Sequence, residues 1–300
     1  MTSWDDLVAD GHARRNVQLA PLTTYKLGGP AALFVEVGEP ALLNRVGEAL
    51  AADPLPVLVL GRGSNLLVAD LGFDGVVLRL GPAFSEFSLA ADGVVTAGGG
   101  LSLPRLARAA GSAGRGRLEW CVGVPGSVGG AVRQNAGCFG SEIVNVIVDA
   151  DVFSLDEGAM STCSASDLNL SYRYSNLGPS QVVTSARFFT AATDPQEAAD
   201  EMRRITRWRR HHQPGGTLNA GSVFKNPAGG AAGAIIDRLG LKGFAVGTVR
   251  VSPRHANFIE AEAGATAADV RRLIATVQAT VFDLSGIELE PEIQFVGFGG

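Results

Sequence analysis

The sequence predicts an α+β fold with two or three domains, and three observations support this prediction. Strand and helix signals alternate as far as residue 189, a strong amphipathic helix follows, and the composition changes after Pro214. The chain has 300 residues, of which 46% are hydrophobic and 18% are charged. A chain of this size and composition can bury sizeable cores in a globular protein.

Each expected element follows from its apolar pattern. Strands are expected where short apolar runs lie between turn residues, and helices where apolar residues recur at helical spacing. The expected strands are residues 32–37, 56–60, 66–69, 76–80, 94–97, 144–153 and 182–189. The expected helices are residues 40–52, 102–113 and 194–210. A boundary near residue 205 is expected to separate a first half, with subdomains of about 1–75 and 76–205, from a C-terminal domain of residues 206–300.

Charge and cysteine usage exclude several classes of function. The formal net charge is −5, so no global basic field would recruit nucleic acid or an anionic membrane. Apolar runs such as Leu55 to Leu60 are too short to span a bilayer, and the segment from Met1 to Asp6 is neither basic nor apolar. The three cysteines are isolated, which argues against a disulfide framework or a metal site. A cytoplasmic protein is expected.

Two glycine-rich phrases indicate a nucleotide cofactor. The first lies between two apolar strands, and its backbone N–H groups would suit a diphosphate, although it matches neither the dinucleotide fingerprint nor the P-loop. Its residues are Gly61, Arg62, Gly63, Ser64 and Asn65. The second phrase removes side chains from a backbone face and so leaves room for a flat cofactor. Its candidates are Gly123, Pro125, Gly126, Ser127, Gly129, Gly130, Asn135 and Gly137. A plain hairpin and a helix packed closely on a sheet are the respective alternatives.

The segment from Asn219 to Pro227 carries the most concentrated polar chemistry. Within it, the hydroxyl of Ser222, the cation of Lys225 and the amide of Asn226 follow an entry of small residues. The alternative is a strand that leads into a turn, with Ser and Asn bonded to their own backbone.

Further candidates lie in two other segments. Tyr172 and Arg173 stand in a turn-rich region, where the guanidinium could fork onto a carboxylate or stack on tyrosine at the surface. Glu290 and Glu292 flank Pro291 beside an apolar strand, and one of them could point inward. The alternative is a pair of exposed glutamates on an edge strand. We expect His255 to be a hydrogen-bonded structural histidine rather than a catalytic one.

These phrases occur in an order that resembles the UDP-N-acetylenolpyruvoylglucosamine reductases, specifically their shorter subtype. The resemblance covers nearly the whole chain. The remaining matching phrases are Thr23 to Gly29, His255 to Phe258 and Leu289 to Glu292. It implies a first half with an FAD-binding fold of the vanillyl-alcohol-oxidase (PCMH) type in two subdomains, and a C-terminal α+β substrate domain.

The resemblance also implies residue roles. Arg173, Ser222 and Glu292 would be catalytic, the two glycine phrases would hold FAD without a covalent bond, and Tyr172, Lys225 and Asn226 would face the substrate. NADPH would be the co-substrate, and the substrate would be a UDP-sugar bearing an enolpyruvyl ether, with no protein partner required. Gln294 departs from the family, which often has arginine there, and Arg250 is a candidate replacement.

Two other functions are the alternatives to this reductase. An FAD-dependent sugar or alcohol oxidase of the same fold would often tether its flavin through a histidine near the first glycine phrase, where this chain has Arg62, Ser64 and Asn65. A non-catalytic flavin-binding or nucleotide-sugar-binding protein would not need Arg173, Ser222 and Glu292 together.

Overall fold

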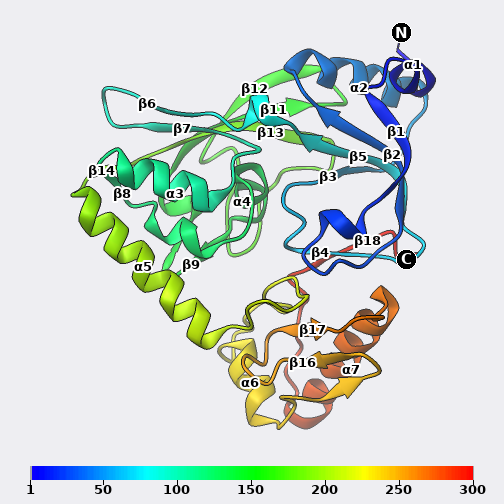
Figure 1. The fold of residues 1–300 in the computed structure, drawn as a ribbon, viewed down its shortest axis with the longest axis vertical. Coiled ribbons are helices and arrows are strands. Elements are labelled where there is room, and N and C mark those ends of the chain that lie inside the picture. The colour runs from blue at the N-terminus through cyan, green and yellow to red at the C-terminus, as the bar shows by residue number, and fades with distance from the viewer. Residues whose placement is uncertain (1, 300) are drawn as a thin grey trace. The chain divides into compact units, whose positions relative to one another are not determined.

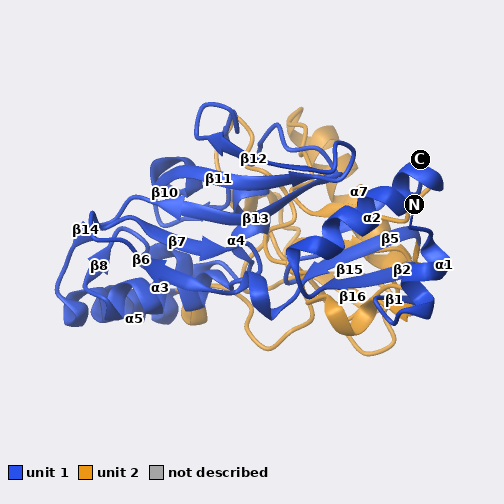
Figure 2. Ribbon diagram, turned by 90° about the horizontal axis from the view of Figure 1, so that it is seen from above, with its two compact units in different colours: residues 1–16, 32–62, 74–208 blue, residues 17–31, 63–73, 209–300 orange. Residues whose placement is uncertain are grey.

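The structure is a computed structural model that describes residues 2–299. The chain forms two compact units, and each unit is assembled from segments that are far apart in the sequence (Figure 2). Unit 1 comprises Met1–Asn16, Ala32–Arg62 and Asp74–Trp208. Unit 2 comprises Val17–Ala31, Gly63–Phe73 and Arg209–Gly300. These units are not the predicted domains, whose boundaries remain predictions.

A five-stranded antiparallel sheet forms the larger part of unit 1, with the strand order β12-β11-β13-β7-β6 (Figure 1). The strands are β6 (Phe87–Leu89), β7 (Val95–Gly98), β11 (Ile147–Ser154), β12 (Ala159–Ser164) and β13 (Gln181–Phe188). The helices of this part are α3 (Leu103–Ser112), α4 (Val128–Gln134) and α5 (Pro195–His212). Helix α4 packs against β13 and β7, and α3 and α4 contribute buried leucine, valine and alanine side chains to one core with the sheet. Burial of this apolar surface is the main stabilising term.

Short pairs complete this part of the unit. Strand β8 (Arg115–Gly116) pairs with β14 (Ala191–Ala192), and β9 (Gly137–Cys138) pairs with β10 (Ser141–Glu142). The 3-10 helix η3 (Glu119–Gly123) packs against α3.

The N-terminal part of the chain forms a four-stranded sheet with the strand order β1-β2-β5-β3. Its strands are β1 (Ala13–Gln18), β2 (Pro30–Val37), β3 (Val57–Val59) and β5 (Phe73–Leu80), and its helices are α1 (Trp4–Ala9) and α2 (Pro40–Ala52). The apolar stripe of α2 buries Leu43 and Val46 in a core of their own with Val35 and Leu78. This stripe is the periodic pattern from which the sequence predicts the helix.

Unit 2 holds a three-stranded antiparallel sheet and two helices. The elements are α6 (Ala232–Arg238), β15 (Ala245–Val246), β16 (Val249–Val251), β17 (Ile259–Ala261) and α7 (Ala267–Ser285). The C-terminal strand β18 (Gln294–Val296) pairs in parallel with β4 (Leu66–Val68). This pairing makes the early segment Gly63–Phe73 part of the same unit as the chain's last strand.

All the predicted strands and helices are present, and the structure differs from the predictions about them at two places. The strand predicted from Val144 begins at Ile147, because residues Ile143–Asn145 form a 3-10 turn that Glu142 and Asn145 cap reciprocally. The hairpin alternative for the first glycine phrase is wrong, since β3 pairs with β5 while β4 pairs with β18. Local apolar runs specify strands but not their partners.

Asp70 offers a test of how far unit 2 depends on its early segment. Its two carboxylate oxygens accept the backbone N–H groups of Ala267 and Ala268 at 2.8 and 3.0 Å, at the start of α7. A negative charge that satisfies free N–H groups stabilises a helix N-terminus. We expect Asp70→Ala to lower the free energy of unfolding by about 1 kcal/mol, measured by thermal denaturation. Asp283→Ala, an exposed change at the other end of α7, should leave it within about 0.5 kcal/mol, and equal effects would contradict this role.

Candidate active site

In unit 2 the Ser222 segment and the Glu292 segment run side by side. The N–H of Lys225 donates to the carbonyl of Glu290 at 2.9 Å, and the N–H of Glu292 donates to the carbonyl of Val223 at 2.7 Å. Phe224 and Pro291 form an antiparallel bridge between these bonds. Two segments that are some 70 residues apart in sequence are therefore held at the spacing of paired strands.

Asn257 clamps the other side of the same segment. Its amide oxygen accepts the N–H of Phe224 at 2.9 Å, and its amide nitrogen donates to the carbonyl of Phe224 at 2.8 Å. Its own carbonyl accepts the N–H of Val223 at 2.8 Å. Asn257 is only 4% exposed, so all these bonds are shielded from water and are costly to break. The clamp fixes the backbone next to Ser222.

Asn65 of the first glycine phrase also holds the backbone of Glu292. The side-chain nitrogen of Asn65 donates to the carbonyl of Glu292 at 3.1 Å, and the N–H of Gln294 donates to the carbonyl of Asn65 at 2.9 Å. Three segments of unit 2 thus determine where the Glu292 backbone lies. Glu292 and Ser222 are both half-buried residues.

Lys225 and Asn226 have protein contacts of their own. The ammonium of Lys225 pairs with the carboxylate of Glu290 at 2.6 Å. The amide oxygen of Asn226 accepts the N–H of Ala232 at 3.0 Å, at the first turn of α6. Their predicted substrate contacts remain predictions. Arg250 is the candidate to take the place of the arginine that this chain lacks at Gln294. Its guanidinium forms ion pairs with Glu260 and Glu262.

In unit 1 a tight loop presents Arg173. Ser171 and Tyr174 exchange backbone hydrogen bonds at 3.1 and 3.0 Å, which leaves Tyr172 and Arg173 at the loop tip. The guanidinium of Arg173 donates to the carbonyls of Asn135 and Gly137 at 3.3 and 3.1 Å, and it lies 5.0 Å from the centre of the Tyr172 ring. Arg173 has a φ of 54°, a conformation that non-glycine residues adopt at a cost. The loop therefore holds this cation in a defined place.

The buried side chain of Asn135 supports that loop through hydrogen bonds. It is fully buried, and its amide nitrogen donates to Glu142 at 2.6 Å and to the carbonyl of Ser171 at 2.9 Å. Its amide oxygen accepts the N–H of Val144 at 2.9 Å. The side chain predicted to contact a cofactor thus makes three bonds within unit 1, and its observed role is to support the Arg173 loop.

The two glycine phrases meet at Gly61 and Ser127. A Cβ on Gly61 would lie 2.4 Å from the Ser127 hydroxyl oxygen, so only glycine permits this approach. Ser127 is 4% exposed and caps α4 by accepting the N–H of Gly130 at 3.3 Å. A third phrase that the sequence reading missed, Gly98 to Gly100, lies against the second phrase, since the N–H of Gly129 donates to the carbonyl of Gly99 at 2.8 Å. Three consecutive glycines before a helix were the available signal.

The first phrase has the donors that a diphosphate requires. Within residues 2–299, none of the five backbone amides from Gly61 to Asn65 donates a hydrogen bond to another residue. Clustered free amides of this kind bind phosphate oxygens. In the second phrase, a Cβ on Gly126 would meet only the Val124 side chain, at an ordinary contact distance of 3.8 Å. The residues present fit a bound dinucleotide such as FAD.

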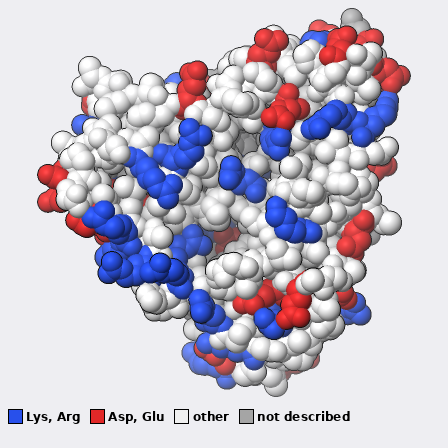
Figure 3. Space-filling view, viewed as in Figure 1, with Lys and Arg blue, Asp and Glu red and all other residues white. Residues whose placement is uncertain are grey.

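Basic side chains gather over α5, as Figure 3 shows. Arg203 and Arg204 pair with Asp200 and Glu201 one turn away, which is the behaviour of a solvated helix face. Hydrogen bonding of this kind to Arg204 lowers the pKa of the Glu201 carboxyl. In the described part of the chain, no cluster of side chains with metal-ligand character and no helix long and apolar enough to cross a membrane occurs.

Comparison with known proteins decides the family. The family model for the C-terminal domain of UDP-N-acetylenolpyruvoylglucosamine reductase matches residues 213–296, and the model for an FAD binding domain matches residues 31–164. A UDP-N-acetylenolpyruvoylglucosamine reductase from Heliobacterium modesticaldum is 43% identical over 280 residues, which cover 93% of this chain and 88% of that protein. The chain belongs to the UDP-N-acetylenolpyruvoylglucosamine reductase family.

Other members of the reductase family agree. The enzyme of this name from Anoxybacillus flavithermus is 38% identical over 96% of this chain and 95% of its own length. The crystal structure of the reductase from Thermus caldophilus superposes with a TM-score of 0.83, at 35% identity over 95% of this chain and 99% of that one. The predicted α+β class, the FAD-binding domain and the family resemblance are confirmed.

The reductase-family phrase around His255 has a structural function in this chain. The ring nitrogen Nδ1 of His255 accepts the N–H of Asn257 at 3.3 Å, and the ring meets Phe258 edge-on with centres 4.9 Å apart. Burial lowers the pKa of His255 below its ordinary value, and the nearby charge of Lys242 acts in the same direction. Asn257, which the sequence reading did not single out, stands two residues later and is the residue that this histidine supports.

His255 should therefore make stability depend on pH. Between its lowered pKa and about 6.5 the unfolded chain binds more protons than the folded one, so stability falls as pH falls through this window. We expect thermal stability to drop as pH falls from about 7.5 to the lowered pKa of His255, which contributes at most about 1.4 kcal/mol per pH unit. His255→Gln should lose less stability over this range than the wild type. Identical pH profiles would show that His255 does not contribute.

Proposed function

We propose that this chain reduces UDP-N-acetylenolpyruvoylglucosamine to UDP-N-acetylmuramate for peptidoglycan precursor synthesis, with FAD as bound cofactor and NADPH as co-substrate. Membership in the reductase family and the FAD-binding domain support this activity. The observation that carries the proposal is the backbone pairing of the Ser222 and Glu292 segments in unit 2.

The reaction defines what the protein residues must do. Hydride addition at the β carbon of the enol ether places negative charge on the α carbon and on the adjoining carboxylate. Bound FAD supplies the hydride chemistry, and NADPH provides the electrons. The protein must then supply hydrogen-bond donors at the carboxylate and a proton at the α carbon.

Arg173 is the proposed carboxylate donor. A guanidinium presents planar forked donors that match a carboxylate. The carbonyls of Asn135 and Gly137 hold the Arg173 side chain, and the Tyr172 ring lies beside it. Donors that are already oriented need not reorganise when charge develops on the substrate.

Ser222 is the proposed proton donor, and Glu292 assists it. No hydrogen-bond partner for the Ser222 hydroxyl exists among the described residues, so its proton is available. A hydroxyl is a weak acid, but the α carbon becomes strongly basic and can accept its proton. Glu292 would add a donor as a neutral acid or through a water, because an ionised carboxylate would repel the developing charge.

The cytoplasm is the proposed compartment. Cys121 and Cys163 are free thiols, and burial raises the pKa of Cys121 well above its usual value. Thiols persist in reducing compartments.

The direct test of the function is NADPH oxidation by the flavin-loaded protein, which must depend strictly on the enolpyruvyl sugar nucleotide. Oxidation of a sugar or alcohol by molecular oxygen, with release of hydrogen peroxide and no need for NADPH, would identify an oxidase instead.

Ser222→Ala should separate the two half-reactions. The variant should retain bleaching of the flavin by NADPH, because that step needs no proton from Ser222. Reoxidation by the enolpyruvyl substrate should slow by at least about 10²-fold, the usual size of a general-acid effect. Stopped-flow absorbance of the flavin measures both steps, and equal loss of the two would refute the proton-donor role.

Asn257→Asp should slow the same half-reaction through Ser222. The change keeps the acceptor for the Phe224 N–H and replaces the donor to the Phe224 carbonyl with a second oxygen. Loss of one buried hydrogen bond predicts a deficit of about 10- to 100-fold in reoxidation, with flavin bleaching preserved. In the double variant with Ser222→Ala, we expect no further loss. Additive losses, or equal damage to both half-reactions, would assign Asn257 a purely structural role.

A further inference from the structure

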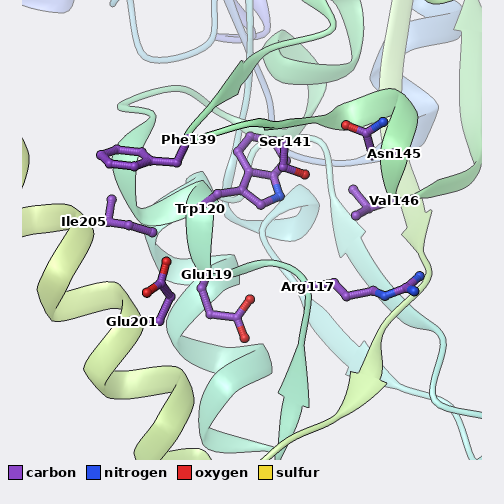
Figure 4. Close-up of a pocket in the computed structure, with 9 residues that line it drawn as sticks. All are labelled: Arg117, Glu119, Trp120, Phe139, Ser141, Asn145, Val146, Glu201 and Ile205. Carbon is purple, nitrogen blue, oxygen red and sulfur yellow. The ribbon is translucent and has the colours of Figure 1, made fainter.

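Unit 1 contains a cavity that includes none of the predicted site residues. Its volume is about 380 Å³, and it lies between η3, the β9–β10 pair and α5 (Figure 4). Six of the residues that line it carry the argument: Arg117, Glu119, Trp120, Phe139, Ser141 and Ile205.

The indole N–H of Trp120 is a donor without an acceptor. Trp120 is 5% exposed, and its Nε1 atom is buried with no hydrogen-bond partner in residues 2–299. Figure 4 shows the indole at the centre of the lining residues, with its nitrogen on the side away from Phe139 and Ile205. Buried donors in folded proteins are nearly always satisfied. A ligand with an acceptor oxygen would satisfy this one.

The charges around the cavity are divided by sign. Figure 4 shows Arg117 on the side away from α5, while Glu119 lies nearer that helix and Glu201 stands on it. Neither the Arg117 nor the Glu119 side chain has a hydrogen bond or ion pair to another described residue, whereas the Glu201 carboxylate is held by Arg204. The cavity thus offers an unpaired cation and an N–H donor on one side, and an unpaired carboxylate on the other.

Backbone strain occurs at two lining residues. Arg117 has a φ of 80° and Phe139 has a φ of 54°, both unfavourable for residues with a side chain. The Phe139 ring packs edge-on against Trp208, with centres 5.2 Å apart. Conformations of this kind occur frequently at ligand sites, where the surrounding structure maintains them.

We propose that this cavity binds a small zwitterion, of the class of a short peptide with free termini. Its carboxylate accepts the indole N–H of Trp120 and faces Arg117, and its ammonium group faces Glu119. The Ser141 hydroxyl supplies a further donor, and Phe139 and Ile205 contact the apolar part of the ligand. Charge-assisted hydrogen bonds at both ends account for recognition, and the free N–H accounts for the orientation.

Isothermal titration of the FAD-loaded protein with L-alanyl-L-alanine tests the proposal. We expect saturable binding with a dissociation constant of about 1 mM, the scale that ligand efficiency sets for a ligand of this size. The N-acetylated dipeptide lacks the ammonium and the dipeptide amide lacks the carboxylate. Each should bind about 10-fold more weakly. Equal binding of all three peptides, or no saturable binding at all, would overturn the proposal.

Variants locate the site. Trp120→Phe keeps the ring but removes the N–H, and Arg117→Gln removes the cation, and each should weaken dipeptide binding about 10-fold. Arg108→Gln, at an exposed arginine of α3 outside the cavity, is the matched control and should bind as the wild type does. If Trp120→Phe fails to retain flavin, the exposed Arg117→Gln still decides the question. Unchanged binding in Arg117→Gln, or an equal loss in Arg108→Gln, would show that the dipeptide does not bind in this cavity.

Discussion

The backbone hydrogen bonds of Glu292 are the constraint on which the proposed chemistry in unit 2 depends. Its N–H donates to Val223, and its carbonyl accepts the side chain of Asn65. Neither bond uses the carboxylate, so the residue is held in place through its backbone. Asn257 fixes the Val223 segment from the other side. Shielded bonds of this kind are expensive to break, which makes the relative placement of these segments rigid.

Unit 1 applies the same principle to Arg173. A fully buried amide side chain, Asn135, holds the loop from beneath, and two backbone carbonyls hold the guanidinium. In both units a buried asparagine uses donor and acceptor together to fix a backbone segment. Asparagine suits this task, because its amide offers two donors and an acceptor at the end of a short side chain. Preorganisation of donors is what electrostatic stabilisation of a developing charge requires.

The glycine phrases show what the sequence pattern could predict about the cofactor site and what it could not. Their number and position predicted a cofactor site, and the free amides of residues 61–65 together with the FAD-binding family model agree with this. The pattern did not reveal that Gly61 is needed for contact with Ser127, or that Gly98 to Gly100 belong to the same region. Close approach of two backbones depends on which segments meet, and a single sequence does not contain that information directly.

The sequence by itself determined the class of fold, several of the helices and strands, the family and the chemical character of the candidate groups, because these follow from local periodicity and from contiguous motifs. Only the tertiary structure decided that β4 pairs with β18, that Asn65 meets Glu292 and that Asn257 clamps the Ser222 segment. It also revealed the unsatisfied N–H of Trp120, since satisfaction of a buried donor depends on every neighbour. Contacts between residues distant in sequence come from packing, and packing is a property of the whole chain.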